Sequence, residues 1–269
     1  MSEAEYIFTD SQFNSELERL RMLEAVSDRA SHRRILSTGL TAGWRCLEVG
    51  AGAGSMMNWM SDQVGVSGKV VAVDVDTRFV ENTSLSNVEV INADIRHIAL
   101  ANNSFDLIHA RNILIHIADF PVALSRMLDL LKPNGWIALE EPDFSAARPI
   151  YGSEAESQAV TKVNKAICRM FSNKGLDSAL GIKLPSILQQ LGLQSLQVEN
   201  DVPLSEGGSN IATMMKMSAM QLAEKYIATG EATREDIEKY CQFAENKTTW
   251  AVYLAKVGVI AQKSETKAR

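Results

Sequence analysis

A glycine-rich segment near residue 50 has the residue types and spacing of a loop that binds a ligand through its backbone. Gly50, Gly52 and Gly54 alternate with alanines. Glycine is favoured where the chain turns tightly and approaches a ligand closely, because a Cβ would intrude there. The segment follows an apolar run at residues 45–49 and precedes a helical pattern at residues 55–64. A doubly wound sheet binds nucleotide-like ligands at this kind of junction.

Acidic residues accompany three successive predicted strands. Asp74 ends the second apolar run, 20 residues beyond Gly54, where a carboxylate can accept hydrogen bonds from both ribose hydroxyls of an adenosine. Asp94 follows the third run and could accept a hydrogen bond from the adenine amino group. Glu48 lies two residues before the first glycine. Each acid by itself is compatible with a solvated loop or a helix cap, but the three together favour an adenosine site.

The spacing of the glycines separates two kinds of adenosine cofactor. A dinucleotide fingerprint has the form G-x-G-x-x-G/A, whereas here Ser55 takes the third position and Gly54 comes one residue early. Glu48 also disfavours a pyrophosphate, because the helix N-terminus that binds one should have no anion nearby. The pattern therefore favours a cofactor that carries an amino group, and a nicotinamide-dependent oxidoreductase is the alternative.

Taken in order, these motifs resemble the class I S-adenosylmethionine-dependent methyltransferases. The resemblance extends over about residues 15–145 and is greatest with the small-molecule branch, which includes ubiquinone, menaquinone and natural-product methyltransferases. The segments that carry it are Glu48-x-Gly50-x-Gly52-x-Gly54, Asp74, Ala93-Asp94-Ile95, and residues 105–111 and 130–136.

The resemblance implies S-adenosyl-L-methionine as the cofactor. It also implies an α/β fold with a Rossmann-like, doubly wound seven-stranded sheet, a reversed last strand and a helical lid. The glycine loop would line the methionine and ribose, Asp74 would bind the ribose, and Asp94 would hold the adenine edge. The backbone at residues 110–111 would reach the methionine amino group. The implied cofactor-binding residues are Glu48, Gly50, Ala51, Gly52, Gly54, Asp74, Val75, Asp76, Ala93, Asp94, Ile95, Ala110 and Arg111.

These residues must be positioned by the secondary structure around them. Short apolar runs alternate there with helical patterns, which predicts a parallel sheet with crossover helices. The predicted strands are residues 45–49, 69–74, 88–91, 105–110 and 136–140, and the predicted helices between them are residues 55–64, 77–85 and 120–131. A further helix is predicted at residues 11–37. Beyond residue 143 the pattern becomes mostly helical, with helices at residues 153–173, 184–191 and 210–229.

This change of pattern predicts four parts. They are an N-terminal helical lid segment at residues 1–37, an S-adenosylmethionine-binding core at residues 38–145, helical acceptor-binding additions at residues 146–248 with one core strand near residues 195–199, and the last core strand and tail at residues 249–269.

Methyl transfer from a sulfonium is an in-line displacement that depends mainly on positioning, with a base where the acceptor must lose a proton. His116 is the candidate base, because it follows the fourth predicted strand and histidine titrates near neutral pH; a structural role in shaping the loop is the alternative. His109 is expected to be a packed core histidine. Glu140, Glu141 and Asp143 could bind a metal, act as a base, attract a cationic acceptor or lie in a solvated loop. No metal site is predicted, since no histidine stands at ligand spacing.

The composition limits the partners. The chain has 269 residues, 46% of them hydrophobic, and a formal net charge of -6 at pH 7, so we expect a globular protein that does not bind nucleic acid. The sequence has no apolar run that could span a membrane and no leader-like start, which predicts a cytoplasmic location and no membrane partner. Four methionines at residues 214–220 favour a small, largely apolar acceptor. A binding protein or cyclase that holds the cofactor without methyl transfer is a further alternative.

Overall fold

The computed structural model describes residues 13–265, which form two compact units. The unit that we call the sheet unit contains Ser27–Glu141, Gly181–Glu199 and the chain from Val257 onward. The other, called the helical unit, contains the chain up to Val26, Pro142–Leu180 and Asn200–Lys256. Each unit is therefore assembled from three separate segments of the chain.

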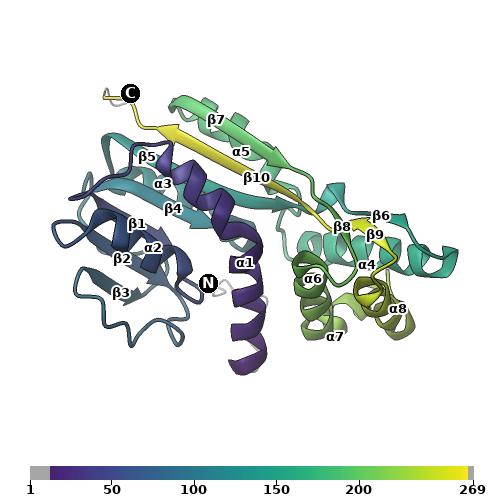
Figure 1. Cartoon of the computed structure of the whole chain (residues 1–269). Coiled ribbons are helices and arrows are strands. Elements are labelled where there is room, and N and C mark those ends of the chain that lie inside the picture. The colour runs from purple at the N-terminus through teal and green to yellow at the C-terminus, as the bar shows by residue number, and fades with distance from the viewer. Residues whose placement is uncertain (1–12, 266–269) are drawn as a thin grey trace. The chain divides into compact units, whose positions relative to one another are not determined.

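A seven-stranded sheet with the order β3-β2-β1-β4-β5-β10-β7 forms the centre of the sheet unit (Figure 1). The first five strands in this order are parallel. The order reverses between β1 and β4, and ligands bind doubly wound sheets at such a switch point. The strands are β1 Arg45–Val49, β2 Lys69–Asp74, β3 Val88–Asn92, β4 Phe105–Arg111, β5 Leu131–Asp143, β7 Gln194–Asp201 and β10 Ala255–Gln262.

The last strand, β10, runs in the opposite direction to β5. Asn134 donates its N–H to the carbonyl of Lys263, and Lys263 donates its N–H to the carbonyl of Gly135. These bonds join the beginning of β5 to the end of β10, which is the pairing of antiparallel strands. The predicted seven-stranded sheet with a reversed last strand is confirmed.

Two pairs of helices cover the two faces of this sheet (Figure 1). Helix α2 and the part of α1 that belongs to the sheet unit, residues 27–36, lie over one face, and α3 and α5 lie over the other. On the first face, His32 of α1 stacks on Trp59 of α2 with ring centroids 4.1 Å apart. The bounds are α1 Phe13–Leu36, α2 Ser55–Val64, α3 Phe120–Leu130 and α5 Leu180–Gln190. Because both faces are covered, β2 is continuously apolar from Val70 to Val73 rather than alternating.

The structure contradicts one predicted helix and divides two other predicted elements. Residues 77–85 form turns instead of a helix, and Thr77, Asn82, Thr83 and Ser84 are residue types that favour turns because their side chains compete for backbone hydrogen bonds. The predicted strand at residues 249–262 is two strands, β9 Trp250–Val252 and β10. The predicted helix at residues 210–229 is likewise two helices.

The helical unit combines helices with a small antiparallel sheet. Helix α4 begins at a capping box, in which Ser153 and Glu156 each satisfy the other's backbone N–H. Tyr240 and Tyr253 are buried and meet edge to face, with centroids 6.3 Å apart. The helices are α4 Glu154–Asn173, α6 Asn210–Gln221, α7 Ala223–Ile227 and α8 Arg234–Glu245, and the strands β6 Arg148–Tyr151, β8 Leu204–Glu206 and β9 form the sheet in the order β6-β9-β8.

Within residues 13–265, no helix combines the length and the apolar character that crossing a membrane requires.

Candidate functional site

The glycine loop between β1 and α2 has a backbone that ordinary residues rarely adopt. Gly50 has φ 81° and Gly54 has φ 97°, which is the left-handed region that glycine enters without penalty. An ideal Cβ placed on Gly50 would lie 1.9 Å from Cδ1 of Ile113. The loop that follows β4 therefore packs directly against the glycine loop, and only a glycine allows this close approach.

Asp74, at the end of β2, is connected to this loop. Its Oδ2 accepts a hydrogen bond from the N–H of Gly52 at 3.0 Å, and its Oδ1 accepts one from the N–H of Asp76 at 3.0 Å. Burial raises the pKa of Asp74, and these two N–H groups oppose that rise. The carboxylate thus fixes the shape of the glycine loop, a role that the sequence did not reveal.

The segments after β2 and β3 also meet. The N–H of Ala93 donates to the carbonyl of Asp74 at 2.9 Å, and Nδ2 of Asn92 donates to the carbonyl of Val75 at 3.1 Å. Ile95 is buried, whereas Val75 is exposed. The segments that carry Asp74, Asp76 and Asp94 therefore meet at this end of the sheet, where the resemblance implies the ribose and the adenine.

Two of these acids are engaged by neighbouring arginines. Both carboxylate oxygens of Asp94 accept hydrogen bonds from Nε of Arg96, at 3.0 and 2.9 Å, and Arg78 pairs with Asp76 at 2.9 Å. Burial opposes the ionisation of Asp94, but the bonds from Arg96 outweigh it and lower its pKa. A ligand that used the Asp94 carboxylate would share it with Arg96.

Glu48 is part of a buried chain of charged groups. Its Oε2 lies 2.6 Å from Nδ1 of His109 on β4, and Nε2 of His109 lies 3.4 Å from Oε1 of Glu140 on β5. All three side chains are buried. His109 is a buried core histidine, as the sequence predicts, and it lies between two carboxylates.

Helix α1 supplies the other end of this chain of charges. Nη1 of Arg34 donates to Oε2 of Glu140 at 2.7 Å, and Oγ of Ser31 donates to the same oxygen at 3.0 Å. Nη1 of Arg111 donates to Ser31 and to Asp28, both at 2.9 Å.

Asp28 also accepts a hydrogen bond from Oγ of Ser55 at 3.0 Å. Because Ser55 begins α2 directly after Gly54, the network joins α1 to the end of the glycine loop. We call Asp28, Ser31, Arg34, Glu48, His109, Arg111 and Glu140 the buried charge network.

The network shifts the ionisation of its members in a consistent pattern. Burial alone would raise the pKa of Glu140, but His109, Arg34 and Arg111 lower it to about 2. Burial alone would lower the pKa of His109, but Glu48 and Glu140 raise it to about 9. Burial raises the pKa of Glu48, against the effect of His109. Because the pKa values of Glu48 and His109 are both raised, the two side chains hold a proton between them near neutral pH.

The loop that carries His116 is fixed by Glu141. The carboxylate of Glu141 accepts hydrogen bonds from the N–H groups of Ile113 at 3.0 Å, Leu114 at 2.7 Å and Ile115 at 3.4 Å. Burial raises the pKa of Glu141 to about 8, and these donors oppose the rise. His116 ends the short 3-10 helix Leu114–His116 and is half-buried.

The predicted acidic cluster does not act as one unit and is not solvated. Glu140 belongs to the buried charge network, Glu141 holds the His116 loop, and Asp143 accepts the N–H of Ser145 at 2.8 Å. All three are buried. Within the described part of the chain, no group of three or more His, Cys, Asp or Glu side chains is arranged to hold a metal ion.

The sequence reasoning missed the residues of α1. Asp28, Ser31 and Arg34 are three residues apart, which places them on one face of a helix. That polar stripe was the available signal, but nothing in the local sequence shows that it faces Glu140 and Arg111.

The residues of this site fit the cofactor that the sequence resemblance implies. The loop from Gly50 to Gly54 carries no side chain larger than a methyl group, so it can lie against a ligand. The two oxygens of Asp74 accept the N–H groups of Gly52 and Asp76, and a carboxylate can accept further hydrogen bonds. A ribose with two hydroxyl donors matches this capacity.

A family model described as a methyltransferase domain matches residues 14–181 of this chain. The demethylmenaquinone methyltransferase of Staphylococcus aureus is 30% identical over 108 residues, which are 38% of this chain and 45% of that protein. The chain spans about half the length of the curated relatives it matches.

Solved structures share the fold. Phosphoethanolamine N-methyltransferase 2 of Haemonchus contortus, in complex with phosphomonomethylethanolamine and S-adenosylhomocysteine, aligns with a TM-score of 0.59 at 15% identity, over 98% of this chain and 61% of that chain. The cyclase SpnF aligns with a TM-score of 0.55 at 19% identity, over 89% of this chain and 82% of that chain.

Proposed function

Because the chain belongs to the S-adenosylmethionine-dependent methyltransferases, we propose that it transfers a methyl group from S-adenosylmethionine to a small, largely apolar organic acceptor. The accepting atom is an oxygen, carbon or nitrogen. The observation that carries the proposal is the glycine loop with Asp74 bonded to its backbone N–H at Gly52. This arrangement offers a surface without side chains larger than a methyl group, beside a carboxylate at the switch point of the sheet.

The residues at the ends of β1 to β4 divide the binding of the cofactor. Gly50, Ala51, Gly52 and Gly54 lie along the methionine and ribose, and Asp74 accepts the ribose hydroxyls. Val75, Asp76, Ala93, Asp94 and Ile95 flank the adenine, and the backbone of Ala110 and Arg111 faces the amino group. Glu48 orients the glycine loop and bears on the amino-acid end of the cofactor.

Methyl transfer to the acceptor depends on alignment. The bound cofactor supplies an electrophilic methyl group on a sulfonium, and the protein contributes mainly by holding the acceptor in line with it. His116 is the residue that we assign as general base for an acceptor that must lose a proton. Glu141 positions it by binding three successive N–H groups of its loop.

A calorimetric titration tests the cofactor assignment. S-adenosylmethionine and S-adenosylhomocysteine should bind, and NADH should not. Asp74→Asn should weaken the binding of S-adenosylmethionine by about 10- to 100-fold, because hydrogen bonds to a charged acceptor are lost. The matched control is Asp62→Asn, at an exposed position of α2, which should bind normally. Tighter binding of NADH, or unchanged affinity in Asp74→Asn, would contradict the assignment.

An assay for transfer of a labelled methyl group to candidate acceptors distinguishes a methyltransferase from a protein that only binds the cofactor. This distinction matters because the cyclase SpnF shares the fold. With an acceptor in hand, His116→Ala should lower kcat by about 100-fold or more and remove the acidic limb of the pH–rate profile. His97→Ala, at an exposed histidine, is the control. A rate within a few-fold of the unaltered chain would exclude the base role.

The composition bears on the kind of acceptor and on the location of the reaction. The net charge of -6 disfavours a nucleic-acid acceptor, and the proposed partner is a small molecule. We place the reaction in the cytoplasm, without a membrane partner.

A further inference from the structure

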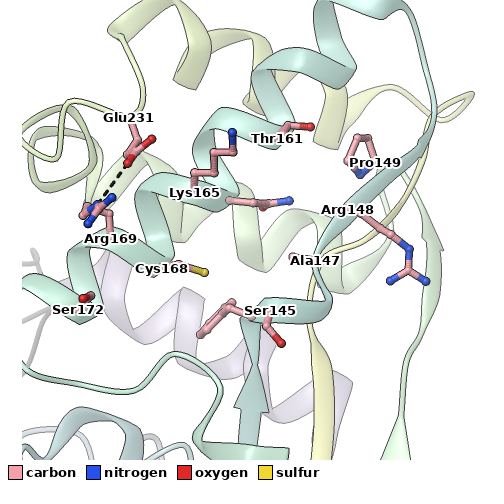
Figure 2. Close-up of a pocket in the computed structure, with 12 residues that line it drawn as sticks. Ser145, Ala147, Arg148, Pro149, Thr161, Lys165, Cys168, Arg169, Ser172 and Glu231 are labelled. Carbon is pink, nitrogen blue, oxygen red and sulfur yellow. Dashed lines mark hydrogen bonds and ion pairs between the residues drawn. The ribbon is translucent and has the colours of Figure 1, made fainter.

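The helical unit contains a cavity of about 680 Å³. One wall is α4, with Asn164, Lys165, Cys168 and Arg169, and the facing wall is the segment from Phe144 to Pro149. Figure 2 shows Lys165, Cys168 and Arg169 along the helix and Arg148 and Pro149 on the strand across from it. This size is typical of pockets that bind small molecules.

Positive charge is in excess around the cavity. Arg148, Lys165 and Arg169 line it, against a single carboxylate, Glu231. Arg169 pairs with Glu231 at 3.2 Å, as the dashed line in Figure 2 marks. Arg148 donates only to the carbonyl of Ala146 at 2.8 Å, and Lys165 has no partner among the residues that the structure describes. Two cations are therefore uncompensated, in a chain whose net charge is negative.

Asn164 is a second and independent sign of a ligand. It is 8% exposed, and neither Oδ1 nor Nδ2 has a hydrogen-bond partner within residues 13–265. A buried amide without partners is unfavourable, and buried polar groups are almost always satisfied. Asn164 lines the cavity, and although its two amide atoms are covered, a rotation of the side chain toward the cavity would let a polar group there satisfy them.

We propose that this cavity binds a small organic anion that has an apolar body. The acidic group, a carboxylate or a phosphate, is held by Lys165 and hydrogen-bonded by the Asn164 amide. The apolar body packs against Phe144 and Pro149. The proposal does not depend on methyl transfer, because it rests only on the residues of the helical unit.

Matched acid and amide probes test the requirement for a negative charge. Calorimetry with the full chain would compare 2-naphthoate with 2-naphthamide, and 4-phenylbenzoate with 4-phenylbenzamide. Each acid should bind at least about 10-fold more tightly than its amide. An additional titration with 1-naphthyl phosphate identifies the preferred acid, since its affinity relative to 2-naphthoate ranks phosphate against carboxylate. Equal affinity for an acid and its amide, or no binding of any acid, would overturn the proposal.

Cysteine protection locates the site. Cys168 lines the cavity and Cys241 does not, and both thiols are free and half-buried. Alkylation with N-ethylmaleimide, followed by mass spectrometry, should show that 2-naphthoate protects Cys168 and leaves Cys241 unprotected. Protection of neither thiol, or equal protection of both, would contradict binding in this cavity.

Two variants connect the binding to its residues. Lys165→Met should weaken the binding of 2-naphthoate by about 10-fold. Lys247→Met, at an exposed position outside the cavity, should leave the binding unchanged. Asn164→Leu removes an unsatisfied amide, so it should raise the Tm of the protein without ligand by about 2–4 °C. The same variant should bind 2-naphthoate about 10-fold more weakly. Unchanged affinity in both cavity variants would overturn the proposal. None of these measurements uses S-adenosylmethionine, so their failure is distinct from a failure of the methyl-transfer proposal.

Discussion

His109 is an imidazole enclosed by carboxylates rather than by solvent. With its ring protonated, the buried charge network contains three cations, Arg34, Arg111 and His109, and three carboxylates, Asp28, Glu48 and Glu140. A buried carboxylate is tolerated only when it is paired and hydrogen-bonded. The two carboxylates that contact His109 therefore favour the imidazolium and raise the pKa of the ring to about 9.

A direct titration of the ring checks this assignment. The chain has four histidines, and the ring signal of His109 in a ¹H–¹³C spectrum is the one that disappears in His109→Gln. Its midpoint should lie near pH 9. Since this folded-state pKa exceeds the unfolded value of about 6.5, the contribution of His109 to stability is complete below pH 6.5 and is lost as the pH rises through 9, by at most about 3 kcal/mol. A midpoint below 6.5 would show that burial outweighs the carboxylates.

At the scale of elements, α1 contributes charged side chains as well as apolar contacts to the sheet unit. Its Ser31 and Arg34 reach Glu140 on β5, and its Asp28 reaches Arg111 at the end of β4 and Ser55 at the beginning of α2. Gly258 of β10 allows this approach, because an ideal Cβ there would lie 2.2 Å from Nε of Arg34. Helix α1 is thus connected to three elements that surround the predicted cofactor site.

Removing the positive charge of Arg34 on α1 should therefore destabilise the fold. Arg34→Met leaves Glu140 buried without its guanidinium, which should lower the free energy of unfolding by about 3–5 kcal/mol. Arg29→Met, at an exposed position of the same helix, should change it by less than about 0.5 kcal/mol. Glu140→Gln in the Arg34→Met background should restore part of the loss, because the amide carries no charge. Urea unfolding measures all three, and equal values for Arg34→Met and Arg29→Met would refute the role of the pair.

The elements also explain what could be predicted from the sequence. The strands from β1 to β4 and the glycine loop were predictable because apolar runs and glycines report local conformation. The pairing of His109 with Glu48 joins residues 61 positions apart, and that of Ser31 with Glu140 joins residues 109 apart, so no local pattern contains them. Residues 77–85 were predicted wrongly, because their spacing fits a helix while their polar side chains favour turns.

At the scale of the whole molecule, both units depend on segments that are distant in the sequence. The sheet unit takes β10 and its edge strand β7 from the second half of the chain. Val257, Val259 and Ile260 of β10 are buried, and β10 lies between β5 and β7. The core predicted at residues 38–145 contains the glycine loop and the acids after it, but lacks these strands and the polar stripe of α1.

A fragment of residues 38–145 should consequently fail to fold by itself. It would expose the edge of β5 that β10 covers, and it would leave Glu140 without Ser31 and Arg34; both an open apolar edge and an unpaired buried charge are strongly unfavourable. Circular dichroism should show no cooperative thermal transition, and calorimetry should detect no S-adenosylmethionine binding, whereas the full chain should show both. A fragment that unfolds cooperatively and binds the cofactor with the affinity of the full chain would show instead that the first five strands are sufficient, and that α1, β7 and β10 serve only the acceptor.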